Sequence, residues 1–161
     1  MFWIGMLASL CLDRLTKLLA VRDLTLGAES WLIPGVVKLQ LSHNDGMALG
    51  VFSGSPVLIV ALPVLAVIAG FFVLRRYRLT AYTALAYGLM IGGFLGNLMD
   101  RVLMGYVVDM IYFTFLPFFI CNMADIAISA GVVMIAISLL FRPQDWREKR
   151  PAKDDTDESA T

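Results

Sequence analysis

The sequence predicts an all-α membrane protein with four transmembrane helices, a small extracytoplasmic β-element and an interfacial segment. Apolar residues make up 59% of the 161 residues, and only 16% are Asp, Glu, Lys or Arg, whereas soluble domains average about 25% charged residues. The charges are also clustered, because residues 79–141 contain only four: Asp100, Arg101, Asp109 and Asp125. This pattern excludes a basic nucleic-acid-binding domain, a disordered chain and a typical soluble enzyme.

Four apolar stretches are long enough to cross a bilayer, which takes about 20 mostly apolar residues. They are residues 2–21, 57–74, 79–99 and 119–141. The first stretch carries Asp13, Arg14 and Lys17. It is expected to be a helix rather than a cleaved signal peptide, because no Lys or Arg precedes its apolar part. Pro63 lies in the second stretch and predicts a slight kink.

Lysine and arginine predict the orientation, because they are enriched in cytoplasmic loops. Eight lie between the second and third spans or near the C-terminus: Arg75, Arg76, Arg78, Arg142, Arg147, Lys149, Arg150 and Lys153. Three lie on the other side: Arg22, Lys38 and Arg101. Both termini are therefore expected in the cytoplasm. We expect residues 1–142 to form the membrane domain and the polar residues 143–161 to form a disordered tail.

The two outer loops, residues 22–56 and 100–118, differ in pattern. In the first, residues 36–42 alternate and Asn44-Asp45-Gly46 follows as a strong tight-turn signal. This predicts the small β-element on the outer face. The second loop is apolar and aromatic, and we expect it to rest in the membrane interface. Its aromatic residues include Tyr106, Tyr112, Phe113, Phe115 and Phe118.

Three carboxylates are expected close to the outer face of the membrane. An ionisable group inside a span is energetically expensive and is therefore a functional candidate. Asp125 is six residues into the fourth span, which places it about 9 Å below the outer end of that helix. Asp100 ends the third span and Asp109 lies in the loop between the two. Asp100 has an alternative structural explanation, a pairing with its neighbour Arg101.

The residues around these carboxylates favour a compact polar site. Asn122 is three residues before Asp125, so the two share a helix face. Small residues recur every four positions in the third span, which lets another helix approach closely. They are Ala84, Gly88, Gly92 and Gly96. Such packing would carry Asn97 and Asp100 toward Asp125.

Two aspartates held close together can perform hydrolysis. They share one proton, because both cannot ionise comfortably. One then acts as a base toward water while the other polarises a carbonyl. The sequence lacks the residues of other hydrolytic mechanisms. His43 is the only histidine, and neither the zinc-binding motif His-Glu-x-x-His nor the serine-hydrolase motif Gly-x-Ser-x-Gly occurs.

Five short motifs occur in order along the chain. They are Asp13-Arg14-Leu15-Thr16-Lys17, Asn44-Asp45-Gly46-Met47-Ala48, Gly92-Gly93-Phe94-Leu95-Gly96-Asn97-Leu98-Met99-Asp100-Arg101, Gly105-Tyr106-Val107-Val108-Asp109 and Asn122-Met123-Ala124-Asp125. Each motif is weakly specific alone. Together, and on four spans, they resemble the motifs of bacterial lipoprotein signal peptidase, also called signal peptidase II.

The resemblance implies an aspartic endopeptidase of the bacterial cytoplasmic membrane. Such an enzyme cuts diacylglyceryl-modified prolipoproteins just before the lipidated cysteine, at the outer leaflet, with Asp109 and Asp125 as the catalytic pair. The residues that it implies around the substrate are Asn44, Gly46, Asn97, Asp100, Arg101, Asn122 and Ala124. No cofactor, metal or nucleic acid is expected. The expected partners are lipid-modified precursors and membrane lipids, and the chain is expected to be monomeric.

Asp13 and Lys17 are four residues apart with the acid first, the favourable order for a helical ion pair. We therefore interpret them as a structural pair rather than as catalytic residues. Arg14 lies on a different helix face and is expected to reach a headgroup or water. Three apolar residues depart from the usual family pattern and bear on pocket shape rather than on chemistry: Leu49, Met110 and Cys121.

Two other functions compete with the peptidase. A small proton or ion transporter would use Asp13, Asp109 and Asp125 as a relay, but it often shows an internal repeat and none is visible in this sequence. A membrane scaffold would not need aspartates in energetically costly places. Cleavage of a lipidated precursor separates the three functions.

Overall fold

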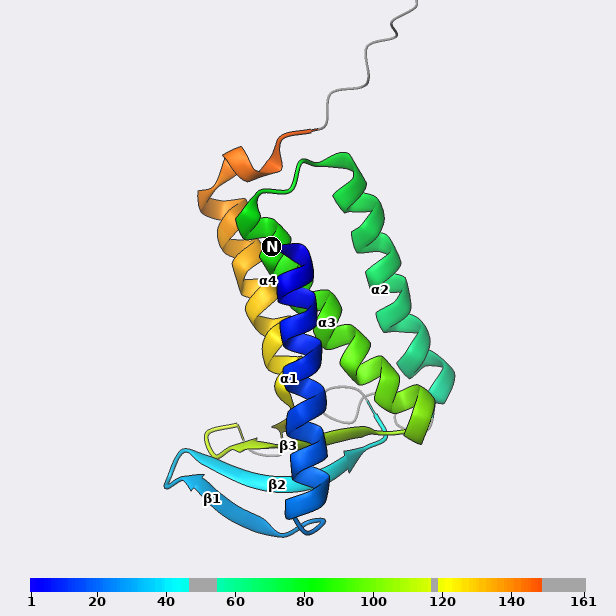
Figure 1. Cartoon of the computed structure of the whole chain (residues 1–161), viewed down its shortest axis with the longest axis vertical. Coiled ribbons are helices and arrows are strands. Elements are labelled where there is room, and N and C mark those ends of the chain that lie inside the picture. The colour runs from blue at the N-terminus through cyan, green and yellow to red at the C-terminus, as the bar shows by residue number, and fades with distance from the viewer. Residues whose placement is uncertain (47–54, 117–118, 149–161) are drawn as a thin grey trace, which may run out of the picture.

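The computed structural model describes residues 1–46, 55–116 and 119–148, and within them the chain forms four α-helices and one antiparallel sheet (Figure 1). The helices are α1 (Phe2–Asp23), α2 (Pro56–Arg76), α3 (Ala81–Met104) and α4 (Met123–Phe141). The strands are β1 (Glu29–Ile33), β2 (Val37–Asn44), β3 (Val107–Phe113) and β4 (Ile120–Cys121). A short 3-10 helix, η2 (Pro143–Trp146), follows α4. The sheet lies across one end of the helices.

Local signals set the ends of α3. Thr80 caps its start, because its side chain accepts from the backbone N–H of Thr83 while the Thr83 hydroxyl accepts from the backbone N–H of Thr80. Gly105 ends the helix in the left-handed region at φ 83°, which glycine adopts without steric strain. The chain then turns directly into β3.

Glycines on α3 allow α1 to pack closely against it. A Cβ at Gly92 would meet the Ser9 hydroxyl and the Met6 carbonyl oxygen of α1, and a Cβ at Gly96 would meet the Asp13 carboxylate. Gly93 faces α4 instead, where a Cβ would lie 2.6 Å from the Ala124 carbonyl oxygen. The predicted small-residue ridge is therefore a helix-packing surface.

The sheet is larger than the predicted β-element. Its strand order is β1-β2-β3-β4, and all neighbouring strands are antiparallel. The second outer loop, expected as an interfacial segment, forms strand β3, whose first four residues, Val107 to Met110, are buried. The β-branched and aromatic residues of this segment favour a strand once β2 offers a pairing edge. The all-α prediction is corrected accordingly.

One helix of the described chain, α4, is long and apolar enough to cross a membrane, with a mean hydropathy of 2.2. Its outward side chains include Val133, Ile137 and Leu140, which are exposed. A shorter apolar helical stretch is Val57–Phe72. Apolar side chains also cover the outside of α1, where Trp3, Leu7, Leu15 and Leu18 are each at least half exposed.

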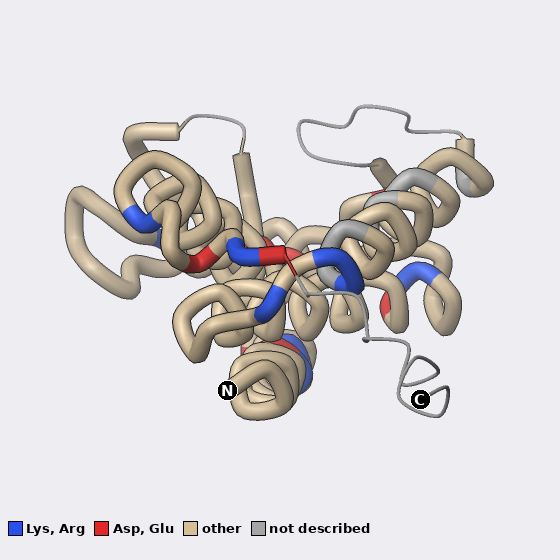
Figure 2. Tube along the Cα trace, turned by 90° about the horizontal axis from the view of Figure 1, so that it is seen from above, with Lys and Arg blue, Asp and Glu red and all other residues tan. Residues whose placement is uncertain are grey.

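The residues that follow α4 pack against the link between α2 and α3. Asp145 is buried and accepts hydrogen bonds from the Ser138 hydroxyl at 2.9 Å and from Arg142 Nε at 2.7 Å. Basic residues of the α2–α3 link and of the segment that follows α4 gather at the end of the molecule opposite the sheet (Figure 2). Residues 143–146 of the expected disordered tail therefore form η2, where Asp145 meets Ser138 of α4 and Arg142, the residue that follows α4. Residues 149–161 lie outside the described residues.

Candidate active site

The first turn of α4 positions Asp125. Asn122 caps the helix, since its Oδ1 accepts from the backbone N–H of Asp125 at 3.0 Å while Asp125 Oδ2 accepts from the backbone N–H of Asn122 at 3.2 Å. Asp125 is therefore the third helical residue. The sequence placed it six residues inside a helix starting at residue 119. That depth is corrected, because Ile120 and Cys121 form β4 and the helix begins only after Asn122.

Strand β3 positions Asp109, which is 2% exposed. Antiparallel pairing sets Asp109 opposite Ser42, so that Asn44 of β2 lies close to it. Asn44 Nδ2 donates to Asp109 Oδ2 at 2.9 Å, and Asn122 Nδ2 donates to Asp109 Oδ1 at 2.6 Å. Both oxygens of this carboxyl are thus held by amide donors from two different elements.

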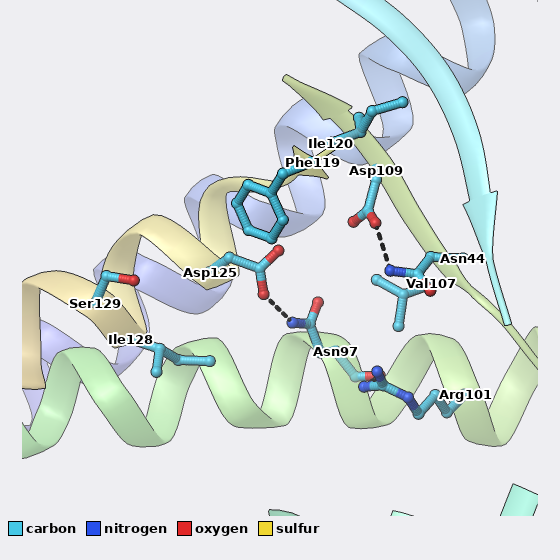
Figure 3. Close-up of a pocket in the computed structure, with 10 residues that line it drawn as sticks. All are labelled: Asn44, Asn97, Arg101, Val107, Asp109, Phe119, Ile120, Asp125, Ile128 and Ser129. Carbon is cyan, nitrogen blue, oxygen red and sulfur yellow. Dashed lines mark hydrogen bonds between the residues drawn. The ribbon is translucent and has the colours of Figure 1, made fainter. Parts of the chain in front are cut away.

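Asp109 and Asp125 face the same cavity, which has a volume of about 180 Å³ (Figure 3). The cavity is large enough for ordered water. Asn97 of α3 reaches it and donates from Nδ2 to Asp125 Oδ1 at 2.9 Å. Of the described residues, ten line it: Asn44, Asn97, Arg101, Val107, Asp109, Phe119, Ile120, Asp125, Ile128 and Ser129.

Burial raises the pKa of Asp109 from 3.8 to about 7, the hydrogen bond from Asn44 opposes this rise, and the negative charge of Asp125 adds to it. A carboxyl with this pKa holds its proton through much of the neutral range. It can therefore act as an acid while its neighbour acts as a base.

Arg101 lines the cavity and contacts Gly46. Arg101 Nη2 donates to the Gly46 carbonyl oxygen at 3.1 Å, and the Gly46 N–H donates to Asn44 Oδ1 at 3.0 Å. These contacts fix the end of β2 against α3. Met47, Ala48 and Leu49, which continue the sequence motif, lie outside the described residues.

Four residues expected around the substrate are not part of the cavity lining: Gly46, Asp100, Asn122 and Ala124. Gly46 and Asn122 instead bond to the lining residues Asn44 and Asp109. Asp100 is fully buried and lies 2.6 Å from Arg14 Nη2 and 2.8 Å from Lys17 Nζ. Its pairing is therefore with α1, and the suggested pairing with Arg101 is wrong. Arg14, expected to reach a headgroup or water, bonds to α3 through Asp100 and Gly96 while its side chain stays 26% exposed. The Ala124 N–H donates to Asp13 Oδ1 at 3.1 Å.

Two of the departures from the family pattern also lie away from the cavity lining. Met110 is buried in an apolar cluster with Ala20, Leu41 and Val108, and Cys121 is buried in β4. Five lining residues were not predicted from the sequence: Val107, Phe119, Ile120, Ile128 and Ser129. Ile128 and Ser129 had a usable signal, since they follow Asp125 by three and four positions on the same helix face.

The class of the site follows from its two carboxyls. A pair of aspartates at one cavity, with burial raising the pKa of one carboxyl to about 7, is the arrangement of an aspartic hydrolase. Residues 5–141 match the family described as signal peptidase II. The chain therefore belongs to the signal peptidase II family, and the resemblance inferred from the five motifs is confirmed.

Relatives and solved structures agree with this assignment. A lipoprotein signal peptidase of Lactobacillus johnsonii is 36% identical over 132 residues, covering 80% of this chain and 84% of the relative. One of Nostoc sp. is 34% identical and covers 89% of this chain and 91% of the relative. A bacterial membrane enzyme solved at 2.3 Å matches with a TM-score of 0.79 and 29% identity, covering 92% of both chains. Another, solved at 1.9 Å, matches with a TM-score of 0.76, 30% identity and coverage of 86% and 92%.

Proposed function

We propose that this chain is a membrane-embedded aspartic endopeptidase that removes signal peptides from diacylglyceryl-modified prolipoproteins, cutting just before the lipidated cysteine. The observation that carries the proposal is the pair Asp109 and Asp125 at one small cavity. Membership of the signal peptidase II family supports the reaction class. The aspartic pair needs no metal or cofactor.

The reaction requires one proton to be shared by the two carboxyls. Asp109, with its pKa near 7, carries that proton in the resting site. Asp125 takes a proton from a water in the cavity as that water attacks the scissile carbonyl, and Asp109 gives its proton to the carbonyl oxygen. When the tetrahedral intermediate collapses, the C–N bond breaks and the proton on Asp125 passes to the leaving amine, while the hydroxyl proton returns to Asp109. Asn44 and Arg101 help to fix the substrate backbone beside the pair.

The membrane holds the acyl chains that anchor the substrate. We propose four spans with both termini in the cytoplasm, which places the sheet and cavity at the outer face of the cytoplasmic membrane. The gathering of basic residues at the opposite end supports this orientation. Acyl chains on the substrate cysteine stay in lipid while the peptide reaches the aspartates. Each buried methylene contributes about 0.8 kcal/mol, so an unmodified cysteine loses most of this binding.

We further propose that residues 1–142 act as one monomeric membrane domain. A transporter is less well supported, because Asp13, one member of the supposed relay, is fully buried and lies within 3.1 Å of both Arg14 and Lys17. Asp13 is thus part of a buried ion-pair cluster and does not line the cavity that holds Asp109 and Asp125.

A cleavage assay in detergent tests the proposed function. The purified chain is incubated with one precursor in two forms, with and without the diacylglyceryl group, and release of the signal peptide is measured. We expect cleavage of the lipidated form only, and its loss by orders of magnitude in Asp109→Asn and Asp125→Asn. Asp23→Asn, which changes an exposed carboxyl on α1, serves as the control and is expected to retain full activity. Near-normal turnover by either dyad variant refutes the dyad, and equal rates on the two precursors refute the lipid requirement.

A further inference from the structure

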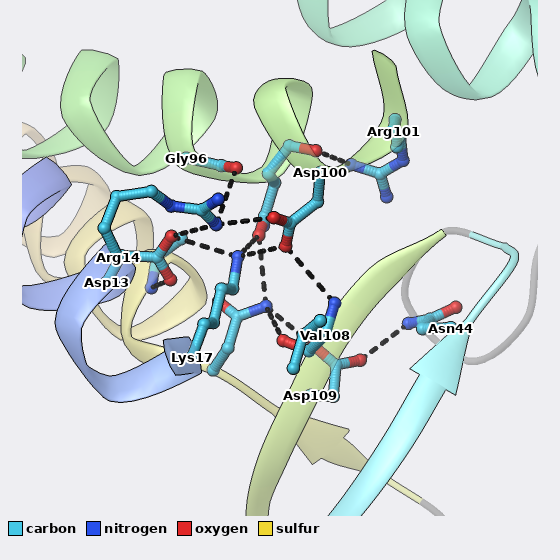
Figure 4. A network of polar contacts seen from close by, with 12 residues as sticks. Asp13, Arg14, Lys17, Asn44, Gly96, Asp100, Arg101, Val108 and Asp109 are labelled. Atoms are coloured by element: carbon cyan, nitrogen blue, oxygen red, sulfur yellow. Dashed lines mark hydrogen bonds and ion pairs between the residues drawn. The ribbon is translucent and has the colours of Figure 1, made fainter. Parts of the chain in front are cut away.

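A cluster of four charged side chains lies between α1 and α3, beside the cavity (Figure 4). It contains the carboxylates of Asp13 and Asp100 and the cations of Arg14 and Lys17. Lys17 is only 3% exposed. Its Nζ lies 3.0 Å from Asp13 Oδ2, 2.8 Å from Asp100 Oδ2 and 2.8 Å from Asn97 Oδ1. An ammonium carries three N–H donors, so these three acceptors match all of them.

The contact with Asn97 leads from this cluster to the cavity. An ammonium can only donate, so the side-chain oxygen of Asn97, not its nitrogen, must face Lys17. Asn122 Nδ2 donates to the same oxygen at 3.0 Å. The amide nitrogen of Asn97 is thereby directed at Asp125 Oδ1, to which it donates at 2.9 Å. A flipped amide would set its oxygen against a carboxylate and its N–H groups against a cation.

We propose that Lys17 is a positioning residue of the active site, and that it acts by selecting the orientation of the Asn97 side chain. This inference deepens the proposed function and rests on it. The selection reaches the second carboxyl as well, because the Asn122 amide that meets Asn97 Oδ1 also donates to Asp109 Oδ1 at 2.6 Å. One buried cation thus orders the amide donors to both aspartates, which goes beyond a structural pairing with Asp13.

Arg14 provides a matched control from the same cluster. It carries the same charge, and within the described residues its hydrogen bonds go to Asp13, Gly96 and Asp100, with Asp100 Oδ1 at 2.6 Å. Arg14→Met and Lys17→Met therefore remove one positive charge from the same pair of carboxylates. Only the lysine variant removes a donor to Asn97.

The experiment measures kcat and KM on the lipidated precursor, corrected for the folded fraction of each variant. We expect Lys17→Met to lower kcat by about 10²-fold with little change in KM, the size of loss that a misplacement of about 1 Å produces. Arg14→Met is expected to retain a kcat close to that of the wild type. Lys17→Gln, which keeps an N–H donor without the charge, is expected to retain most of its kcat. Equal losses in Lys17→Met and Arg14→Met, or in Lys17→Met and Lys17→Gln, overturn the proposal.

A double-mutant cycle tests whether Lys17 acts through Asn97. Asn97→Leu removes the amide at nearly the same size, and in that background Lys17→Met is expected to lower kcat no further. The same fold-loss in both backgrounds shows that Lys17 acts by another route. The wild-type rate tests the proposed function separately. A wild type that leaves the precursor intact refutes both proposals, whereas wild-type cleavage with an unimpaired Lys17→Met refutes only the role of Lys17.

Discussion

The pKa of Asp109 predicts how cleavage depends on pH. With a pKa of about 7, this carboxyl is about 90% protonated at pH 6 and about 10% protonated at pH 8. If the singly protonated pair is the active form, kcat/KM falls about tenfold between these two values. Burial is the main cause of the raised pKa, so the fall of kcat/KM at alkaline pH, the alkaline limb of the pH profile, is a property of the folded site.

The assay is the initial rate of signal-peptide release at constant ionic strength from pH 5.5 to 8.5, with kcat/KM plotted because it reports the free enzyme. Asn44→Leu removes a hydrogen bond that lowers the pKa of Asp109, so it is expected to move the alkaline limb to higher pH. Asp23→Asn is the control and leaves the profile unchanged. A kcat/KM that stays constant up to pH 8.5 refutes the assignment of the shared proton to Asp109.

The folding stability of the protein also depends on the titration of the Asp109 carboxyl. The folded-state pKa of Asp109 is raised from 3.8 to about 7, so its contribution to folding stability is full below pH 3.8 and is lost as the pH rises through 7. The loss is on the order of 4 kcal/mol. Asp109→Asn removes the titrating carboxyl but leaves one of its two amide donors without an acceptor. The variant is therefore expected to be inactive, and its Tm is expected to fall less between pH 5 and pH 8 than that of the wild type. An equal fall in Tm for the two proteins contradicts the argument.

Two further predictions concern packing and topology. Gly5→Ala places a Cβ 2.8 Å from the Leu85 carbonyl oxygen, so it is expected to destabilise the α1–α3 contact by about 1–3 kcal/mol in thermal unfolding. A Cβ at Gly70 meets no described atom within 4 Å, so Gly70→Ala is expected to have no such effect. Equal Tm values for the two variants contradict the packing. Reporter fusions after Arg78 and at the C-terminus should be cytoplasmic, and fusions near Asp45 or Tyr112 external; a cytoplasmic signal at Asp45 overturns the orientation.

The site was predictable where its signals are local or unusual in composition. An aspartate in an apolar stretch stands out without any structure, and so does Asn122 three residues before Asp125. The four-residue spacing of Gly88, Gly92 and Gly96 likewise predicted a close helix contact. This spacing does not identify which helix packs against it. The alternation in residues 36–42 predicted strand β2 for the same reason, since side-chain periodicity is a property of neighbouring residues.

The sequence by itself therefore determined the class of the protein, the family motifs and the two carboxyls of the candidate site. Tertiary structure decided which groups these side chains meet. Asp100 was expected around the substrate, with pairing to Arg101 as the alternative, but it pairs with Arg14, 86 positions away. Lys17 reaches Asn97 across 80 positions. Strand β3 likewise needed the edge of β2 as a partner. Local patterns fix the face on which a residue lies, but the partner of a buried polar group depends on which helices and strands pack together, because such a group must find its hydrogen bonds inside the fold.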